Sequence, residues 1–282
     1  MVILIICIKL KELKKLQKFI MLNNELSTRF DPNNYEFNSE SRLGIYLIHG
    51  FSSTTYEVKK MADYLAKKGY RVRADNLPGH GTSVSDCNST KYIEWLSSVE
   101  NGIAEMYSVC DKVIVIGVSM GAVLSLHLGS LFPVDGIIAA SALFQFKNEF
   151  NVRVINRLFH KIKNVMPKQS TFNPDQVKVK RIKFYGYNYY PLSALNEMRK
   201  MVDQVRKKLH KISSPILLIH SKVDLTAPIA NFQIIQNHLK TKHLETLVLE
   251  KTGHNVFDTE LEDKELIFNT VNQFIDKLFH VK

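Results

Sequence analysis

The sequence predicts an α/β protein with a mostly parallel central sheet flanked by helices, and three observations support this prediction. The chain has 282 residues, which is enough for one large domain with a full hydrophobic core. Hydrophobic residues make up 45% of it and charged residues 23%, the usual balance of a folded globular protein. From Leu43 onward, short apolar runs alternate with longer amphipathic stretches, which is typical of parallel strands covered by helices.

Each strand is expected where a short apolar run is bounded by polar or turn-forming residues, and each helix where apolar residues recur at helical spacing. Strands are expected at 44–49, 71–75, 113–118, 136–140, 216–220 and 245–249. Helices are expected at 56–68, 91–107, 120–132, 229–239 and 264–278.

The alternation stops between residues 144 and 191, where a basic and aromatic stretch replaces it. We expect this stretch to be a small cap insertion that lies over the sheet, and the amphipathic run 195–210 to return the chain to the core. The predicted organisation is an N-terminal extension at 1–42, a core formed by 43–143 and 192–282, and a cap at 144–191.

The N-terminal extension begins with an apolar stretch, residues 1–10, that is too short to span a membrane, because a spanning helix needs about 20 residues. Its lysines lie at or after the end of this stretch, which disfavours a secretory signal. Residues 9–22 have the spacing of a membrane-surface helix, although a dispensable extension, or a natural start at Met21, explains them equally well.

Three widely spaced cysteines, at positions 7, 87 and 110, indicate free thiols in a reducing compartment, so we expect a cytoplasmic protein. They form no C-x-x-C pair and no His-rich cluster that would suggest metal or redox chemistry. The net charge is +11, and residues 147–211 hold 16 Lys and Arg against 4 Asp and Glu. Because no nucleic-acid-binding motif accompanies this excess, we expect no nucleic-acid partner.

The residues Gly117-Val118-Ser119-Met120-Gly121 match G-x-S-x-G directly after an expected strand and directly before an expected helix. A serine nucleophile needs such a context, because it must stand exposed on a tight turn where neighbouring glycines leave room for the backbone. The motif alone is a weak signal, so further evidence has to come from the other strand ends.

Three other strand ends carry suitable residues. The N–H of Phe51, after the first strand, is expected to bind an oxyanion together with the N–H of Met120. Asp224 and His254 follow the two last strands, in the order Ser, Asp, His. We expect His254 to take the proton of Ser119 and Asp224 to fix the imidazole, within hydrogen-bonding reach of it.

The remaining histidines have structural interpretations. His80, in a turn-rich loop, is expected to brace that loop, and His220, at a strand end, to be buried and hydrogen-bonded. His127, on the helix after Ser119, is expected to pack or to face solvent.

Together these motifs resemble those of the small bacterial monoacylglycerol lipases and carboxylesterases of the α/β-hydrolase fold. The resemblance covers residues 44–278 and rests on His49-Gly50-Phe51, Gly79-His80-Gly81-Thr82, Trp95, the Ser119 motif, Asp224 and Gly253-His254. It implies the catalytic triad Ser119, Asp224 and His254, an oxyanion hole formed by Phe51 and Met120, and no metal or organic cofactor. The extension and the Lys-rich cap depart from the family pattern.

The expected function is hydrolysis of carboxylic esters, monoacylglycerols or small acyl esters, through an acyl-enzyme intermediate. A broader hydrolase of aryl or polymeric esters and a slow-turnover ligand-binding protein of the same fold are the alternatives. The basic cap, with Tyr185, Tyr187, Tyr189 and Tyr190, is expected to lie over the site as a solvated surface or as a contact for an anionic membrane surface. The sequence motifs do not predict an oligomeric state.

Overall fold

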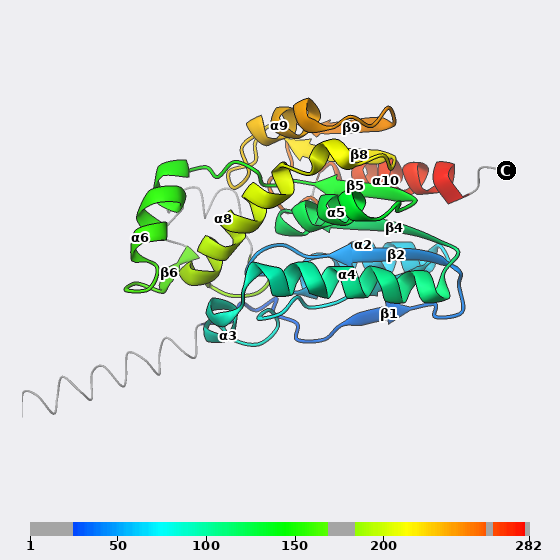
Figure 1. The fold of residues 1–282 in the computed structure, drawn as a ribbon. Coiled ribbons are helices and arrows are strands. Elements are labelled where there is room, and N and C mark those ends of the chain that lie inside the picture. The colour runs from blue at the N-terminus through cyan, green and yellow to red at the C-terminus, as the bar shows by residue number, and fades with distance from the viewer. Residues whose placement is uncertain (1–24, 169–183, 258–261, 280–282) are drawn as a thin grey trace, which may run out of the picture.

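The centre of the molecule is a seven-stranded sheet with the strand order β1-β3-β2-β4-β5-β8-β9. The computed structural model describes residues 25–168, 184–257 and 262–279. All neighbouring strands pair in parallel except β1, which runs antiparallel to β3 at the edge (Figure 1). The strands are β1 (Tyr35–Phe37), β2 (Leu43–Ile48), β3 (Arg71–Ala74), β4 (Lys112–Val118), β5 (Gly136–Ala140), β8 (Ile216–Ser221) and β9 (Leu244–Leu249).

The predicted mostly parallel sheet is therefore confirmed, and all six expected strands are present with ends within one residue of those predicted. Their carboxyl ends meet at one edge of the sheet because the strands are parallel. The chain passes from β2 to β3 on one side and then to β4 on the other side of β2. Ligands of open α/β sheets bind outside the carboxyl ends at such a reversal of strand order.

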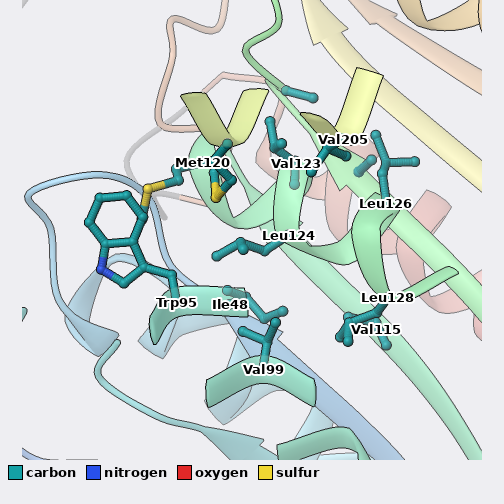
Figure 2. Packing of buried hydrophobic residues seen from close by; sticks show 14 of the residues in the cluster. Ile48, Trp95, Val99, Val115, Met120, Val123, Leu124, Leu126, Leu128 and Val205 are labelled. Atoms are coloured by element: carbon teal, nitrogen blue, oxygen red, sulfur yellow. The ribbon is translucent and has the colours of Figure 1, made fainter. Parts of the chain in front are cut away.

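Helices cover both faces of the sheet. One face packs against α4 (Tyr92–Val109), α5 (Met120–Leu131), α8 (Leu192–Arg206) and α9 (Ala230–His238). The other packs against α2 (Lys59–Lys67), which follows the short η1 (Thr55–Glu57), and α10 (Lys264–Phe279). Figure 2 shows the first of these two cores, where Val123, Leu124 and Leu126 of α5 lie with strand and helix residues such as Ile48 and Val99.

Strand β1 and helix α3 (Val84–Ser89) were not expected. Strand β1 lies within residues 1–42, so part of the segment that the sequence sets apart as an extension belongs to the sheet. Helix α3 (Val84–Ser89) begins after Ser83, whose side chain accepts a hydrogen bond from the N–H of Asp86 and caps the helix.

The described parts of residues 144–191, for which we keep the name cap, lie at one end of the sheet (Figure 1). They contain η2 (Asn151–Asn156), α6 (Arg157–Phe159) and the two-stranded sheet of β6 (Val165–Pro167) and β7 (Tyr189–Pro191). The four tyrosines of the cap differ in burial, since Tyr189 and Tyr190 are half-buried. Tyr185 and Tyr187 are buried, because they pack against the loop that follows β2.

The possible membrane-surface helix at 9–22 lies outside the described residues. Within the part of the chain that is described, no helix is both long enough and apolar enough to cross a membrane.

Candidate active site

Ser119 stands at the turn between β4 and α5 in a strained backbone conformation. Its φ is 57° and its ψ is −115°, a combination that non-glycine residues rarely adopt. The N–H of Ser119 donates to the carbonyl of Ala140 over 2.9 Å, which joins the turn to the neighbouring strand β5. The sequence motif therefore forms the sharp, strained strand-to-helix turn that a nucleophilic serine in a G-x-S-x-G motif requires.

The two glycines of the motif are required by close backbone contacts. A Cβ atom at Gly117 would lie 2.1 Å from the carbonyl oxygen of Gly121, and a Cβ atom at Gly121 would lie 2.0 Å from that of Ile48. Helix α5 thus begins directly against the end of β2, at the edge of the sheet where Ser119 lies.

His254 and Asp224 are joined by a hydrogen bond of 2.7 Å between Nδ1 and Oδ2, which confirms the predicted contact. The other carboxylate oxygen of Asp224 accepts the N–H groups of Thr226, at 2.8 Å, and Ala227, at 2.9 Å. Because Nδ1 of His254 faces the carboxylate, Nε2 is the nitrogen left to exchange a proton with another group.

The electrostatics of this pair favour its charged form. Burial opposes a charge on both residues, but the attraction and the hydrogen bond between them outweigh it. The pKa of Asp224 is therefore lowered and the pKa of His254 is raised. A carboxylate that stabilises the imidazolium in this way assists a histidine that takes up a proton during a reaction.

Ser119 and His254 do not share a hydrogen bond. Within the described ranges, the hydroxyl of Ser119 has no hydrogen-bond partner, although its side chain is nearly buried. Contacts between a nucleophile and its base are often long before substrate is bound, so the expected approach of His254 to Ser119 stays a prediction.

The turn formed by residues 50–53, which we call the oxyanion turn, follows β2 and brings Phe51 to the same edge. The N–H of Ser53 donates to the carbonyl of Gly50 over 3.3 Å and closes the turn. Among the described residues, no acceptor takes the N–H of Phe51 or that of Met120, the first residue of α5. Two backbone donors are therefore available to a developing negative charge.

Two buried histidines orient the oxyanion turn. The Nε2 atom of His49 accepts the N–H of Leu77 over 3.1 Å, so its Nδ1 carries the proton and donates to the carbonyl of Gly50 over 2.8 Å. Likewise, Nε2 of His80 accepts the N–H of Ser52 over 3.0 Å. Burial lowers the pKa of His49 to about 4 and that of His80 well below its usual value, so both rings stay neutral.

The interpretation of His80 as a loop brace is thus confirmed. His220 is buried, and its Nε2 lies 3.0 Å from the carbonyl of Ala227, also as predicted. His127 packs inside the protein, with Nε2 at 2.7 Å from the carboxylate of Glu100.

Three side chains that contact the oxyanion turn were not identified from the sequence. Glu57, almost buried, accepts the N–H of Gly50 at 2.7 Å and the amide of Asn255 at 3.0 Å, and so links the oxyanion turn to the loop of His254. The side chain of His49 was missed because its motif pointed only to backbone donors. Lys168 lies in a Lys-rich cap, where no pattern distinguishes a buried lysine from exposed ones.

A family model described as serine aminopeptidase, S33, matches residues 39–262. A thermostable monoacylglycerol lipase of Bacillus sp. (strain H-257) is 28% identical over 217 residues, which cover 75% of this chain and 82% of the lipase. A carboxylesterase of Bacillus subtilis (strain 168) is 25% identical over 235 residues, which cover 83% of this chain and 92% of the esterase.

Solved structures of low sequence identity share the fold. A structure from work on LipS and LipT, two metagenome-derived lipolytic enzymes, has a TM-score of 0.75 at 23% identity and covers 90% of this chain and 100% of its own. The monoacylglycerol lipase of Paleococcus ferrophilus has a TM-score of 0.70 at 18% identity, with 86% and 97% covered.

Proposed function

Because this chain belongs to the family described as serine aminopeptidase, S33, we propose that it is a serine hydrolase that cleaves carboxylic esters. In this proposal Ser119 is the nucleophile, His254 the general base and acid, and Asp224 the carboxylate that orients the imidazole. The hydrogen bond between His254 and Asp224, at the edge where Ser119 occupies its strained turn, is the observation that carries the proposal.

In the first half of the reaction, Oγ of Ser119 attacks the carbonyl carbon of the ester while Nε2 of His254 takes the hydroxyl proton. The carbonyl electron pair moves onto oxygen, and the N–H groups of Phe51 and Met120 stabilise the resulting oxyanion. When the tetrahedral intermediate collapses, the bond to the alcohol oxygen breaks and His254 gives its proton to the leaving alcohol.

In the second half, water attacks the acyl-enzyme and His254 again takes the proton. Collapse of the second intermediate breaks the bond to Ser119, returns the proton to its Oγ and releases the carboxylic acid. The attraction of Asp224, which raises the pKa of His254, also stabilises the imidazolium that forms in each half of the reaction.

Monoacylglycerols or small acyl esters are the proposed substrates. The named relatives, a monoacylglycerol lipase and a carboxylesterase, support this substrate class, and each is matched over most of its length. Aryl or polymeric esters are the alternative within ester hydrolysis, and a slow-turnover ligand-binding protein is the alternative to an enzyme.

The test is a set of hydrolysis rates for p-nitrophenyl esters of graded acyl length, with monoacylglycerols, feruloyl esters and an aminoacyl anilide alongside. We expect steady turnover of acyl esters and monoacylglycerols that disappears in Ser119→Ala. A single burst of p-nitrophenol without turnover would favour the binding protein. Faster cleavage of the anilide than of every ester would contradict ester hydrolysis as the main activity.

We also propose that the cap contacts an anionic membrane surface. Several large apolar side chains on η2, on α6 and beside them are exposed to solvent. Four of them recur every four residues, and residues at this spacing share one side of a helix. They are Phe150, Val154, Leu158 and Ile162, with Ile155 and Phe159 beside them. Residues 147–168 also hold six Lys or Arg against one Glu. An exposed apolar stripe among basic residues is typical of helices that lie in a membrane interface.

Vesicle co-sedimentation tests this contact, with neutral phosphatidylcholine compared with mixtures that contain phosphatidylserine, at low and at high salt. We expect binding to anionic vesicles that weakens with salt and is lost when Leu158→Asn is combined with Ile162→Asn. Leu266→Asn, which removes an exposed leucine from α10, is the matched control. Equal and negligible binding to both lipids at low salt would leave the basic cap as a solvated surface.

A cytoplasmic location is the remaining part of the proposal. It is supported by the cysteines, because Cys87 and Cys110 are both free thiols. Detection of the protein by fractionation of cells of its source organism tests this location, and recovery from the culture medium would contradict it.

A further inference from the structure

Lys168 is a buried lysine of the cap that contacts the oxyanion turn. It follows β6 directly, and only 5% of it is exposed. Its ammonium group donates to the carbonyl of Ser52 over 3.2 Å and lies 5.1 Å from the ring centroid of Phe184 and 5.5 Å from that of Tyr190. A lysine is rarely this buried, because removing its charge from water is unfavourable unless other groups compensate.

A chain of hydrogen bonds runs from this ammonium group to the proposed oxyanion donor. The carbonyl of Ser52, which Lys168 contacts, shares its peptide group with the N–H of Ser53. That N–H donates to the carbonyl of Gly50, and the peptide group of this carbonyl carries the N–H of Phe51. The Lys168 ammonium, the peptide group between Ser52 and Ser53 and the peptide group between Gly50 and Phe51 therefore form one series of hydrogen bonds. Each group in the series donates to the next, and the last donor is the N–H of Phe51. Hydrogen bonds arranged in this way polarise one another.

The cap backbone holds the same turn. The N–H of Tyr187 donates to the carbonyl of Ser52 over 3.0 Å, beside Lys168, and the carbonyl of Tyr185 accepts the hydroxyl of Thr54 over 2.6 Å. At Gly186 a Cβ atom would lie 2.6 Å from the carbonyl oxygen of Ser52. The cap backbone thus holds this turn through contacts that involve no charge.

We propose that Lys168 is a positioning residue whose ammonium charge, through the peptide groups of Ser52 and Gly50, orients and polarises the N–H of Phe51 that binds the oxyanion. The inference rests on the proposed ester hydrolysis and on Phe51 as an oxyanion donor. The alternative is that Lys168 only anchors the cap on the core.

The charge of Lys168 is sensitive to pH near neutrality. Burial lowers its pKa to about 7, against the attraction of the Glu57 carboxylate. Glu57, Cys87 and His80 interact with it electrostatically, and the phenol ring of Tyr190 also lies near it. Burial keeps the Cys87 thiol and the His80 ring neutral. An amine that has lost its proton still donates a hydrogen bond but polarises the chain less, so the benefit of Lys168 should fall as the pH rises through about 7.

The experiment compares Lys168→Met, Lys168→Gln and Lys168→Arg in the full chain. Lys163→Met is the matched control, because it removes an exposed lysine of the same cap. Measurements are kcat and KM on a short p-nitrophenyl ester, inhibition by an alkyl trifluoromethyl ketone, which forms a tetrahedral oxyanion on the nucleophile, and the urea midpoint of unfolding.

We expect Lys168→Met to lower kcat by about tenfold, less than the loss of a whole oxyanion donor, with KM nearly unchanged. The ketone should bind more weakly by about the same factor. Lys168→Arg should keep most of kcat and should flatten the decline of kcat above about pH 7, because a guanidinium stays charged. Lys168→Gln, which keeps a donor but not the charge, should resemble Lys168→Met, and Lys163→Met should resemble the wild type.

A lower urea midpoint with unchanged kcat and ketone affinity would overturn the proposal and leave Lys168 as an anchor. If Lys168→Met does not fold, equal kcat values for Lys168→Gln and Lys168→Arg would overturn it in the same way. Full activity of Ser119→Ala would instead contradict the proposed function itself, so the two failures are distinguishable.

Discussion

Glu57 Oε1 accepts a hydrogen bond from the side-chain amide of Asn255 over 3.0 Å, next to His254 in the chain. The other oxygen of the same carboxylate accepts the N–H of Gly50 over 2.7 Å. One buried carboxylate therefore joins two loops that are about 200 residues apart, the oxyanion turn and the loop of the proposed general base. Its negative charge also helps to raise the pKa of His254.

Glu57→Gln should destabilise the protein by about 1–3 kcal/mol, because a glutamine offers one acceptor where the carboxylate offers two, and its NH₂ would face a donor in a buried place. The measurement is the free energy of unfolding in urea at constant m-value. Glu245→Gln, which removes a carboxylate from an exposed ion pair with Lys277, is the control and should change stability by less than about 1 kcal/mol. Equal effects of the two substitutions would mean that the two hydrogen bonds accepted by Glu57 add nothing to the stability of the fold.

Ser119→Ala should lower kcat by several orders of magnitude, on the scale of the roughly 10⁶-fold loss known for a serine protease nucleophile. Stability should barely change, since the hydroxyl has no hydrogen-bond partner in the described part of the protein. Rates on a p-nitrophenyl ester and the thermal midpoint check both statements. Ser130→Ala, which alters another serine of α5, should keep full activity. Near-normal activity of purified Ser119→Ala would refute Ser119 as nucleophile.

The central strands and the contact between Asp224 and His254 could be predicted from the sequence because parallel strands leave clear signals. Strands β4 and β8 are buried on both faces and read as apolar runs, and residues that follow such parallel strands must meet at one edge. Strand β1 gave no such signal, since it has three residues at the sheet edge and an exposed Glu36.

The roles of Glu57, His49 and Lys168 depend on tertiary contacts that no periodicity encodes. Glu57 lies in a short 3₁₀ turn, and its partners are 7 and 198 residues away. The burial of Tyr185 and Tyr187 could not be predicted for the same reason, because aromatic residues among lysines do not reveal that the oxyanion turn packs against them.

Asp224→Asn should lower kcat by about 10⁴-fold, as expected when a triad histidine loses the carboxylate that selects its tautomer.

The same substitution should also shift the acidic limb of the pH profile. Asp224 raises the pKa of His254, and only the neutral imidazole accepts the proton of Ser119, so wild-type activity should rise with pH through a pKa above about 6.5. Without the carboxylate this limb should move to lower pH. Profiles of kcat/KM from about pH 5 to about pH 9 measure it. A limb that moves upward, or does not move, would show that another acid sets the pKa of His254.

Gly121→Ala should destabilise the fold more than a single extra methyl group in an ordinary core position. The added Cβ would lie 2.0 Å from the carbonyl oxygen of Ile48 and 2.6 Å from that of His49, both backbone atoms. Helix α5 would have to move away from β2, at a cost of about 1–3 kcal/mol or more. The same movement would carry the N–H of Met120 away from that of Phe51, so kcat should fall as well.

The control for this substitution is Gly253→Ala, which lies beside His254 but has no described atom within 4 Å of the added Cβ. Urea unfolding of the two variants, with kcat on a short ester, separates the effect of crowding from that of losing a flexible residue. We expect Gly253→Ala to keep the wild-type midpoint to within the equivalent of about 0.5 kcal/mol. Equal losses in both variants would contradict the steric explanation, because only Gly121 has a backbone carbonyl in the way.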